Sequence, residues 1–198
     1  ATRKIADKRF DARVTISSRD EFGELADSFN HMAHRLENQF QVLSAMADID
    51  RAALSFPKEE QVVETILSQI KDRFLIDMVA LTVCKKNGAG PKTFMAGRGT
   101  LPNRPAEVKR PIPRELLDNT GPETILISRE DGRLPAYLSD YTAYGVERFL
   151  ILPIRFKGQT KGLLSLGSKD EHLWDEETVA LSRQIADQVG IVLSSASL

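Results

Sequence analysis

The stretch FLILPIRFKGQTKGLLSLG, residues 149–167, decides the fold class of this 198-residue chain. It contains two apolar runs of strand length, Phe149–Ile154 and Gly162–Gly167, and such runs are typical of buried strands when turn signals bound them. Lys157-Gly158-Gln159 between them is a turn signal centred on glycine. The stretch therefore predicts two antiparallel strands joined by a tight hairpin.

The region before this hairpin predicts a second one. Met78–Cys84 is a buried strand by its length and its β-branched residues, and Thr93–Ala96 is another strand. Asn87–Pro91 between them is a strong turn signal. A further strand is expected over residues 124–127, so the sheet should be largely antiparallel.

Helices are predicted on both sides of these strands. The apolar residues of 58–76 and 175–195 recur at helical spacing, and 135–144 predicts a short helix. Residues 97–112 are rich in glycine, proline and arginine and are expected to form a loop, with one helical turn over 112–117. Because the helices at both ends of the strand region should pack on one face, the order of elements predicts an α+β fold, not a doubly wound one.

One long helix is predicted over residues 20–55, because no proline occurs from Ala1 to Phe56 and Gly23 is the only glycine there. Its apolar residues follow spacings of three and four, which is the heptad pattern of a coiled-coil seam. The seam residues are Phe22, Leu25, Phe29, Met32, Leu36, Phe40 and Leu43.

Two registers compete in the second half of this helix. Strict heptads place Gln39 and Met46 in the seam, whereas a shift of four residues places Phe40 and Ala47 there, and Leu43 serves either register. We interpret this junction as a candidate switch between two packings. The alternative is a static linker helix whose extra apolar residues cover the following domain.

Composition excludes several classes of protein. The net charge of −1 and the pI of about 6.4 give no basic field for nucleic acid. The single cysteine, Cys84, cannot form a disulfide within the chain, which favours a reducing, cytoplasmic setting. No apolar stretch reaches the ~18 residues that a membrane-spanning helix needs. The sequence starts in the middle of a pattern at Ala1–Ala6, so we expect it to be a fragment of a longer chain.

Residues 1–43 resemble a HAMP domain. Lys8-Arg9-Phe10 and Val14 match the spacing of its connector, expected over residues 8–19, although Lys8 stands where the family usually has glycine. Asp20-Glu21-Phe22-Gly23 matches the signature that opens its second helix. The resemblance implies a parallel helical bundle and a homodimer through the long helix. It also implies connector roles for Phe10, Val14, Glu21 and Gly23.

Residues 44–198 look like a GAF domain. The resemblance rests on Asp48–Ala52 in the entry helix, on Leu150–Ile154, on Gly162–Leu166 and on the order of elements. A HAMP domain followed by a GAF domain implies a bacterial transmembrane sensor, as in two-component systems. Its membrane helices would precede this chain, which would be the cytoplasmic portion of an inner-membrane protein. A histidine kinase or diguanylate cyclase output domain would follow.

The candidate residues for catalysis or metal binding have simpler explanations. His31 and His34 fall at solvent-side heptad positions, and His172 lies in a polar turn without a partner for a metal or haem. Cys84 ends a buried strand, where a small apolar residue needs no further role. We find no phosphate-binding loop and no nucleophile with a base. The sequence therefore predicts no enzyme, no metal and no cofactor.

All three tyrosines lie within eight residues, at Tyr137, Tyr141 and Tyr144, and their spacing places them on one face of a short helix. Arg129 and Asp131 lie just before them. An aromatic wall with a few polar groups suits a small-molecule pocket, and the ligand pocket of GAF domains resembles this region. Plain packing of a short helix on the sheet explains the same pattern and stays open as an alternative.

Together these patterns predict a non-catalytic signal-transduction fragment. A HAMP-like coiled coil would relay a conformational signal through a dimeric GAF domain to an output domain. The alternative is an autonomous GAF sensor whose small-molecule ligand sets the output state.

Overall fold

The computed structural model describes residues 14, 21–55, 59–73, 76–84, 90–99, 101, 106–118, 121, 124–170 and 173–195. The chain divides into two compact units, residues 1–44 and 45–198. The prediction of one long helix is confirmed, since α2 spans Glu21–Ser55 without interruption. The coiled coil that its heptads indicate stays a prediction.

In the first unit, the predicted connector residue Val14 is tied to α2 by the side chain of Asn30. The Val14 N–H donates to Asn30 Oδ1 at 2.8 Å, and Asn30 Nδ2 donates to the Val14 carbonyl oxygen at 2.9 Å. Asn30 thus satisfies both backbone groups of one residue sixteen positions earlier. Of the other predicted connector residues, Phe10 lies outside the described residues, Glu21 is the first residue of α2, and Gly23 is half-buried within α2.

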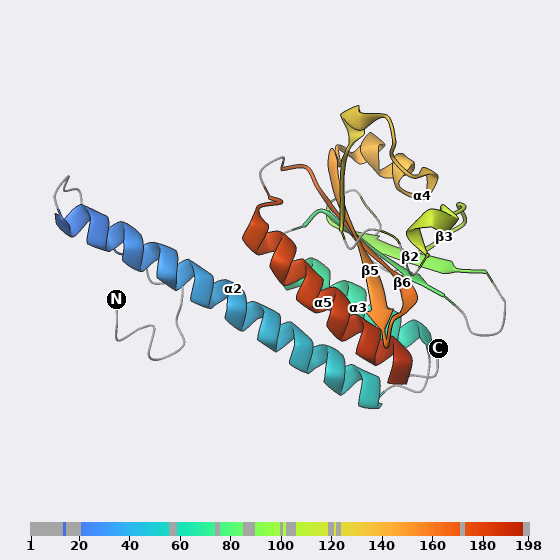
Figure 1. Cartoon of the computed structure of the whole chain (residues 1–198), viewed down its shortest axis with the longest axis horizontal. Coiled ribbons are helices and arrows are strands. Elements are labelled where there is room, and N and C mark those ends of the chain that lie inside the picture. Colours follow the sequence, from blue (N-terminus) through green and yellow to red (C-terminus); the bar gives the residue numbers. More distant parts are fainter. Residues whose placement is uncertain are drawn as a thin grey trace. The chain divides into compact units, whose positions relative to one another are not determined.

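The second unit is built on a six-stranded antiparallel sheet with the order β3-β2-β1-β6-β5-β4 (Figure 1). The strands are β1 (Met78–Val83), β2 (Lys92–Gly97), β3 (Ala106–Val108), β4 (Ile125–Ser128), β5 (Arg148–Phe156) and β6 (Gln159–Ser168). Both predicted hairpins are present, β1–β2 and β5–β6. Lys157 and Gly158 form the tip of the second hairpin with φ of 50° and 73°, as the tightest hairpin turns require.

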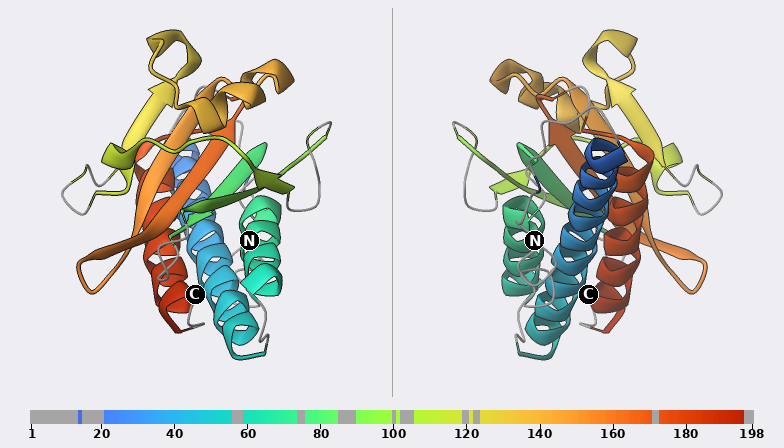
Figure 2. Two further views of the ribbon diagram at one scale, coloured as in Figure 1. Left: turned by 90° about the vertical axis from the view of Figure 1, so that its right-hand side faces the viewer. Right: turned by 90° about the vertical axis from the view of Figure 1, so that its left-hand side faces the viewer.

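Helices α3 (Glu59–Arg73) and α5 (Glu176–Ser195) run along one face of this sheet (Figure 2). The apolar face of α3 is fully buried through Val62, Val63, Ile66, Leu67 and Ile70. At Gly190, α5 approaches β5 so closely that an added Cβ would lie 2.6 Å from the Arg155 carbonyl oxygen. The predicted α+β fold, with helices from both ends of the strand region on one face, is therefore confirmed.

The opposite face of the sheet carries short helical segments: η1 (Arg114–Leu116), α4 (Ala136–Ser139) and η3 (Asp140–Tyr144), with η2 (Arg129–Asp131) after β4. The short helix predicted before β5 is thus one α-helical turn that continues as a 3-10 helix. Beneath it lies an apolar core that includes Tyr137, Leu138, Phe149 and Leu163.

One element differs from the sequence prediction. The stretch 97–112 is not only a loop, because Ala106–Val108 forms the edge strand β3 and pairs with β2 from Thr93 to Met95. Ala106 and Glu107 are exposed and Val108 is half-buried, and three such residues directly after a proline carry too little pattern to indicate a strand on their own. The already ordered edge of β2 supplies the hydrogen bonds that make β3 a strand.

Candidate functional site

A pocket of about 310 Å³ opens where the β2–β3 edge of the sheet meets η3. Strand β3 brings its own residues and the two that follow it to one wall, and η3 supplies the opposite wall. The lining residues are Met95, Ala106, Glu107, Val108, Lys109, Arg110, Asp140, Tyr141 and Tyr144. The volume is at the lower end of what small-molecule sites show.

An ion pair joins the two walls of this pocket. Arg110 Nε donates to Asp140 Oδ2 at 3.1 Å, and Arg110 Nη2 donates to Asp140 Oδ1 at 2.8 Å. The ion pair is bidentate, which orients both side chains. Both side chains are about half exposed, Arg110 at 50% and Asp140 at 55%. An exposed pair of this kind contributes little stability, so its main effect is to hold η3 against the segment after β3.

Two of the three predicted tyrosines line the pocket. Tyr141 is buried, and its burial raises its pKa to about 12, with the neighbouring Asp140 and Tyr144 adding to the rise. Tyr144 is 41% exposed at the mouth. The pocket therefore presents one buried phenol and one phenol that solvent and any ligand can reach.

The third tyrosine has a different place. Tyr137 is 1% exposed in the core, and its hydroxyl lies 2.9 Å from Ser165 Oγ on β6. Burial raises its pKa to about 12, which outweighs the lowering by the hydrogen bond with Ser165. Tyr137 thus anchors α4 to the middle of the sheet and does not line the pocket.

Arg129 and Asp131, which the sequence places beside the tyrosines, do not line the pocket. Arg129 Nη1 pairs with Glu147 Oε1 at 3.2 Å on the surface. Asp131 Oδ2 accepts the Ser128 N–H at 2.7 Å and so closes the capping box of η2. Both residues stabilise the turn between β4 and α4.

Sequence reasoning missed the cationic wall of the pocket, Lys109 and Arg110, and its partner Asp140. The signal was weak, because Lys109-Arg110 lies in a stretch predicted as a loop and about thirty residues before Asp140. Only the pairing of β3 with β2 brings this dipeptide to η3.

Other reactive side chains form no site in the described part of the chain. No group of three or more histidine, cysteine or acidic residues there is placed to hold a metal ion. His31 is exposed on α2, and His172 lies outside the described residues. Cys84 is partly buried, and burial raises the pKa of its thiol while the charge of Lys161 lowers it. A raised thiol pKa disfavours the reactive thiolate.

The predicted seam of α2 is a stripe of apolar side chains that the first unit leaves accessible. Five of its residues are strongly exposed: Phe22 at 65%, Leu25 at 66%, Met32 at 49%, Phe40 at 42% and Leu43 at 64%. Phe29 and Leu36 are half-buried. Among the described helices, none is long and apolar enough to cross a membrane.

The HAMP domain family matches residues 1–38 and the GAF domain family matches residues 33–193. No curated protein matches the sequence. Among solved structures, the chain is similar to the A. aeolicus nlh2 GAF domain in an inactive state, with 12% identity over 79% of this chain and 98% of that chain and a TM-score of 0.57.

Two further solved structures are similar to this chain: one is a GAF domain with bound phycoerythrobilin, and the other is a reductase in complex with its substrate. A phycoerythrobilin-bound GAF domain from a cyanobacterial phytochrome is 13% identical over 80% of this chain and 97% of that chain, with a TM-score of 0.56. The free methionine-R-sulfoxide reductase of Neisseria meningitidis, in complex with its substrate, is 13% identical over 78% and 89%, with a TM-score of 0.54. At these identities the likeness shows the fold alone.

Proposed function

The chain belongs to the GAF domain family and carries a HAMP domain ahead of its GAF domain, and from this premise we propose that it is a non-catalytic relay module. The combination of the two domains supports a signal-transduction sensor role. In our proposal a conformational change enters through the HAMP part, passes through a dimeric GAF domain and reaches an output domain.

The observation that carries this proposal is the continuity of α2. The helix runs unbroken from Glu21 to Ser55, so it begins inside the HAMP match and ends inside the GAF match. A helix is stiff along its axis, and a rotation or shift at one end is transmitted to the other end. One helix that belongs to both domains is therefore a direct mechanical link between them.

Dimerisation is the second part of the proposal, and the exposed stripe on α2 supports it. Large apolar side chains at heptad positions are expensive to leave in water, and a second copy of the same helix buries them in register. HAMP domains occur in membrane sensor proteins. We therefore also propose that the chain works on the cytoplasmic side of an inner membrane, as part of a longer receptor with an output domain such as a histidine kinase or diguanylate cyclase.

The test is the oligomeric state of the purified chain, measured by analytical ultracentrifugation over a range of concentrations. Leu36→Glu should weaken the dimer at least tenfold. In the dimer, each copy would bury a glutamate charge in the seam and would lose the burial of a leucine, which contributes about 1.5–3 kcal/mol. His31→Glu is the matched control on the exposed side of the same helix and should leave the dimer unchanged. A wild-type chain that stays monomeric at high concentration would overturn the proposal.

A second candidate function is small-molecule sensing by the GAF domain, favoured by the pocket of Tyr141, Tyr144 and Arg110. Native mass spectrometry of the freshly purified chain would detect a bound molecule as added mass. Arg110→Ala and Tyr144→Ala should remove that mass, and Arg114→Ala, on the exposed segment η1, is the control. Retention of the same mass in both pocket variants would place the ligand elsewhere.

A further inference from the structure

The pocket between β3 and η3 contains two carboxylates, and each of them already has a cation. Asp140 accepts both hydrogen bonds of the Arg110 fork, at 3.1 and 2.8 Å. Glu107 Oε2 lies 3.8 Å from the Nζ atom of Lys92, which stands on β2 and does not line the pocket. Among the described side chains, the negative charges of this pocket are therefore balanced.

The cationic wall of the same pocket has donors to spare. Lys109 is exposed there, and its ammonium group has no ion pair with a described residue. Arg110 gives Asp140 one hydrogen from Nε and one from Nη2, although a guanidinium group carries five. The described side chains thus leave one positive charge without a counter-charge at this wall, together with the remaining N–H groups of Arg110.

The hydroxyl of Tyr141 is a further donor in this pocket. Tyr141 is 7% exposed and lines the pocket, yet its hydroxyl makes no hydrogen bond within the described part of the chain. The oxygen itself is not closed off, so a group that enters the pocket can reach it. A buried hydroxyl without a partner is unfavourable, and an acceptor on a ligand would satisfy it.

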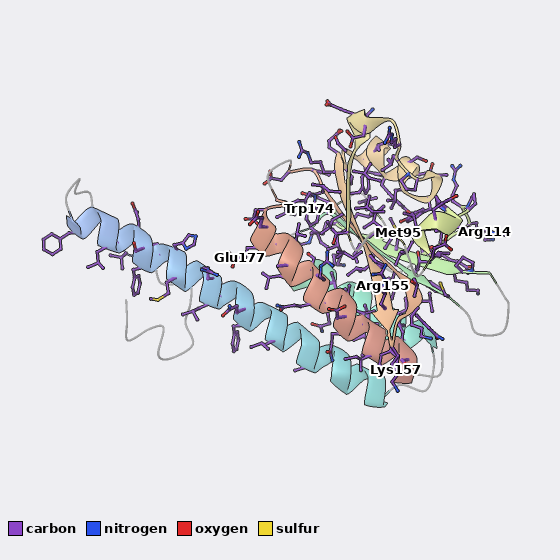
Figure 3. All side chains as sticks on the ribbon, viewed as in Figure 1. Met95, Arg114, Arg155, Lys157, Trp174 and Glu177 are labelled. Atoms are coloured by element: carbon purple, nitrogen blue, oxygen red, sulfur yellow. The ribbon has the colours of Figure 1, made fainter. Side chains whose placement is uncertain are left out.

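The rest of the lining is apolar and suits a flat ring. Met95 on β2 is 2% exposed (Figure 3), Val108 is half-buried, and Tyr144 presents an exposed aromatic ring at the mouth. Aromatic rings stack favourably on one another and make favourable contacts with methionine sulfur. The volume of about 310 Å³ limits the ligand to a small molecule.

We infer that this pocket binds a small aromatic carboxylate. The carboxylate accepts hydrogen bonds from Lys109, Arg110 and the Tyr141 hydroxyl, and the ring packs against Tyr144 and Met95. The single negative charge of a carboxylate matches the one unbalanced positive charge, whereas a phosphate monoester carries close to two. The inference rests on the second candidate function, small-molecule sensing by the GAF domain, and names the class of its ligand.

The test is a titration of the isotope-labelled chain with four probes, benzoate, benzamide, benzylamine and acetate, at constant ionic strength kept with sodium chloride. Amide signals of residues 106–110 and 140–144 should shift and saturate with benzoate. Benzamide has nearly the same shape without the charge, and acetate has the charge without the ring. Each of these two should bind at least tenfold more weakly than benzoate, and benzylamine should bind more weakly still.

The outcomes separate this inference from the function on which it rests. Benzamide, benzylamine or acetate binding as tightly as benzoate would overturn the inference and leave the pocket as a binding site. Binding of none of the four probes would also overturn it. The added mass of a copurified molecule, and its loss in Arg110→Ala, would then still decide the second candidate function.

Two variants should move the preference for benzoate over benzamide in opposite directions. Lys109→Gln removes the unbalanced charge and should lower the ratio of the two affinities at least threefold. Asp140→Asn releases the Arg110 fork and should raise it at least threefold. The ratio cancels general changes of pocket shape, because both probes depend on that shape. Lys157→Gln, at the tip of the β5–β6 hairpin, is the matched control and should leave the ratio unchanged (Figure 3).

Tyr141→Phe tests the hydroxyl and should weaken benzoate binding at least fivefold, because hydrogen bonds to charged groups are strong. Tyr137→Phe is its control, because that hydroxyl lies beside Ser165 in the core and outside the pocket. A well-dispersed spectrum shows that each variant is folded. Wild-type benzoate affinity in a folded Tyr141→Phe chain, or a wild-type ratio in a folded Lys109→Gln or Asp140→Asn chain, would overturn the inference.

Discussion

The hydroxyl groups of Tyr137 and Ser165 lie 2.9 Å apart inside the core, on side chains that are 1% and 0% exposed. This contact joins α4 to the centre of β6. It places a polar pair among Phe149, Leu138 and Leu163, where an unpaired hydroxyl would be costly.

The first prediction concerns this pair. Tyr137→Phe and Ser165→Ala should each lower the free energy of unfolding by roughly 1–3 kcal/mol, because each leaves the other hydroxyl buried without its partner. The double variant should lose less than the sum of the two, since no orphaned hydroxyl remains. Urea denaturation of the four chains measures this cycle, and strictly additive losses would show that the two groups are not coupled.

The second prediction is a loss of stability at high pH. The pKa of Tyr137 is raised to about 12 in the folded chain, against about 10 for an unfolded tyrosine. The folded state thus holds the proton more tightly, so the contribution is complete below about pH 10 and is lost as the pH rises toward 12. Tyr141 shifts in the same direction.

Denaturant unfolding at several values of pH between neutral and 12 measures this loss. The wild-type free energy of unfolding should fall more steeply above pH 10 than that of Tyr137→Phe, which lacks the titrating group. Tyr144→Phe is the control, because Tyr144 lies at the surface. Equal slopes for wild type and Tyr137→Phe would contradict the prediction.

Much of the fold follows from local pattern. Apolar runs on either side of a glycine turn predict the β5–β6 hairpin, and long apolar periodicities predict helices α2, α3 and α5. The structure has all of these elements within a few residues of the predicted bounds. Strand β3 was missed because its three residues depend on pairing with β2, which no local pattern records.

The candidate pocket was harder to predict than the fold. Sequence proximity linked Arg129 and Asp131 to the tyrosines, but both stabilise the η2 turn instead. Arg110 reaches Asp140 across thirty positions, and Arg155 reaches Gly121 across thirty-four. Such contacts depend on strand order and strand length, so a single sequence does not reveal them.

The third prediction tests how the connector is held. Asn30→Ala removes both hydrogen bonds to Val14, so the Val14 amide should exchange with solvent at least tenfold faster than in wild type. Asn30→Asp keeps the acceptor for the Val14 N–H and loses the donor, so most of the protection should remain. Amide hydrogen exchange measures both, and slow exchange in Asn30→Ala would mean that another group protects Val14.

The last prediction concerns the register of α2 over residues 36–47. Gln39 and Phe40 are both exposed in the single chain, so a dimer has two choices of seam. Burial of Phe40 favours the shifted register by ~1.5–3 kcal/mol, whereas continuity with the upstream heptads favours Gln39. Two packings of similar free energy are what a relay requires, because a small input then changes their populations.

Gln39→Leu should favour one register and Phe40→Gln should remove the other, so the two variants should differ in geometry. Spin labels at Ala47, which is exposed, report distances across the dimer in a Cys84→Ser background. We expect two distance distributions in wild type and a single, different one in each variant, because Ala47 lies in the seam of only one register. Leu43 belongs to both seams, so labels there should change little and provide the control. Identical distances at Ala47 in all three chains would mean that α2 is a static linker whose extra apolar residues only cover the GAF domain.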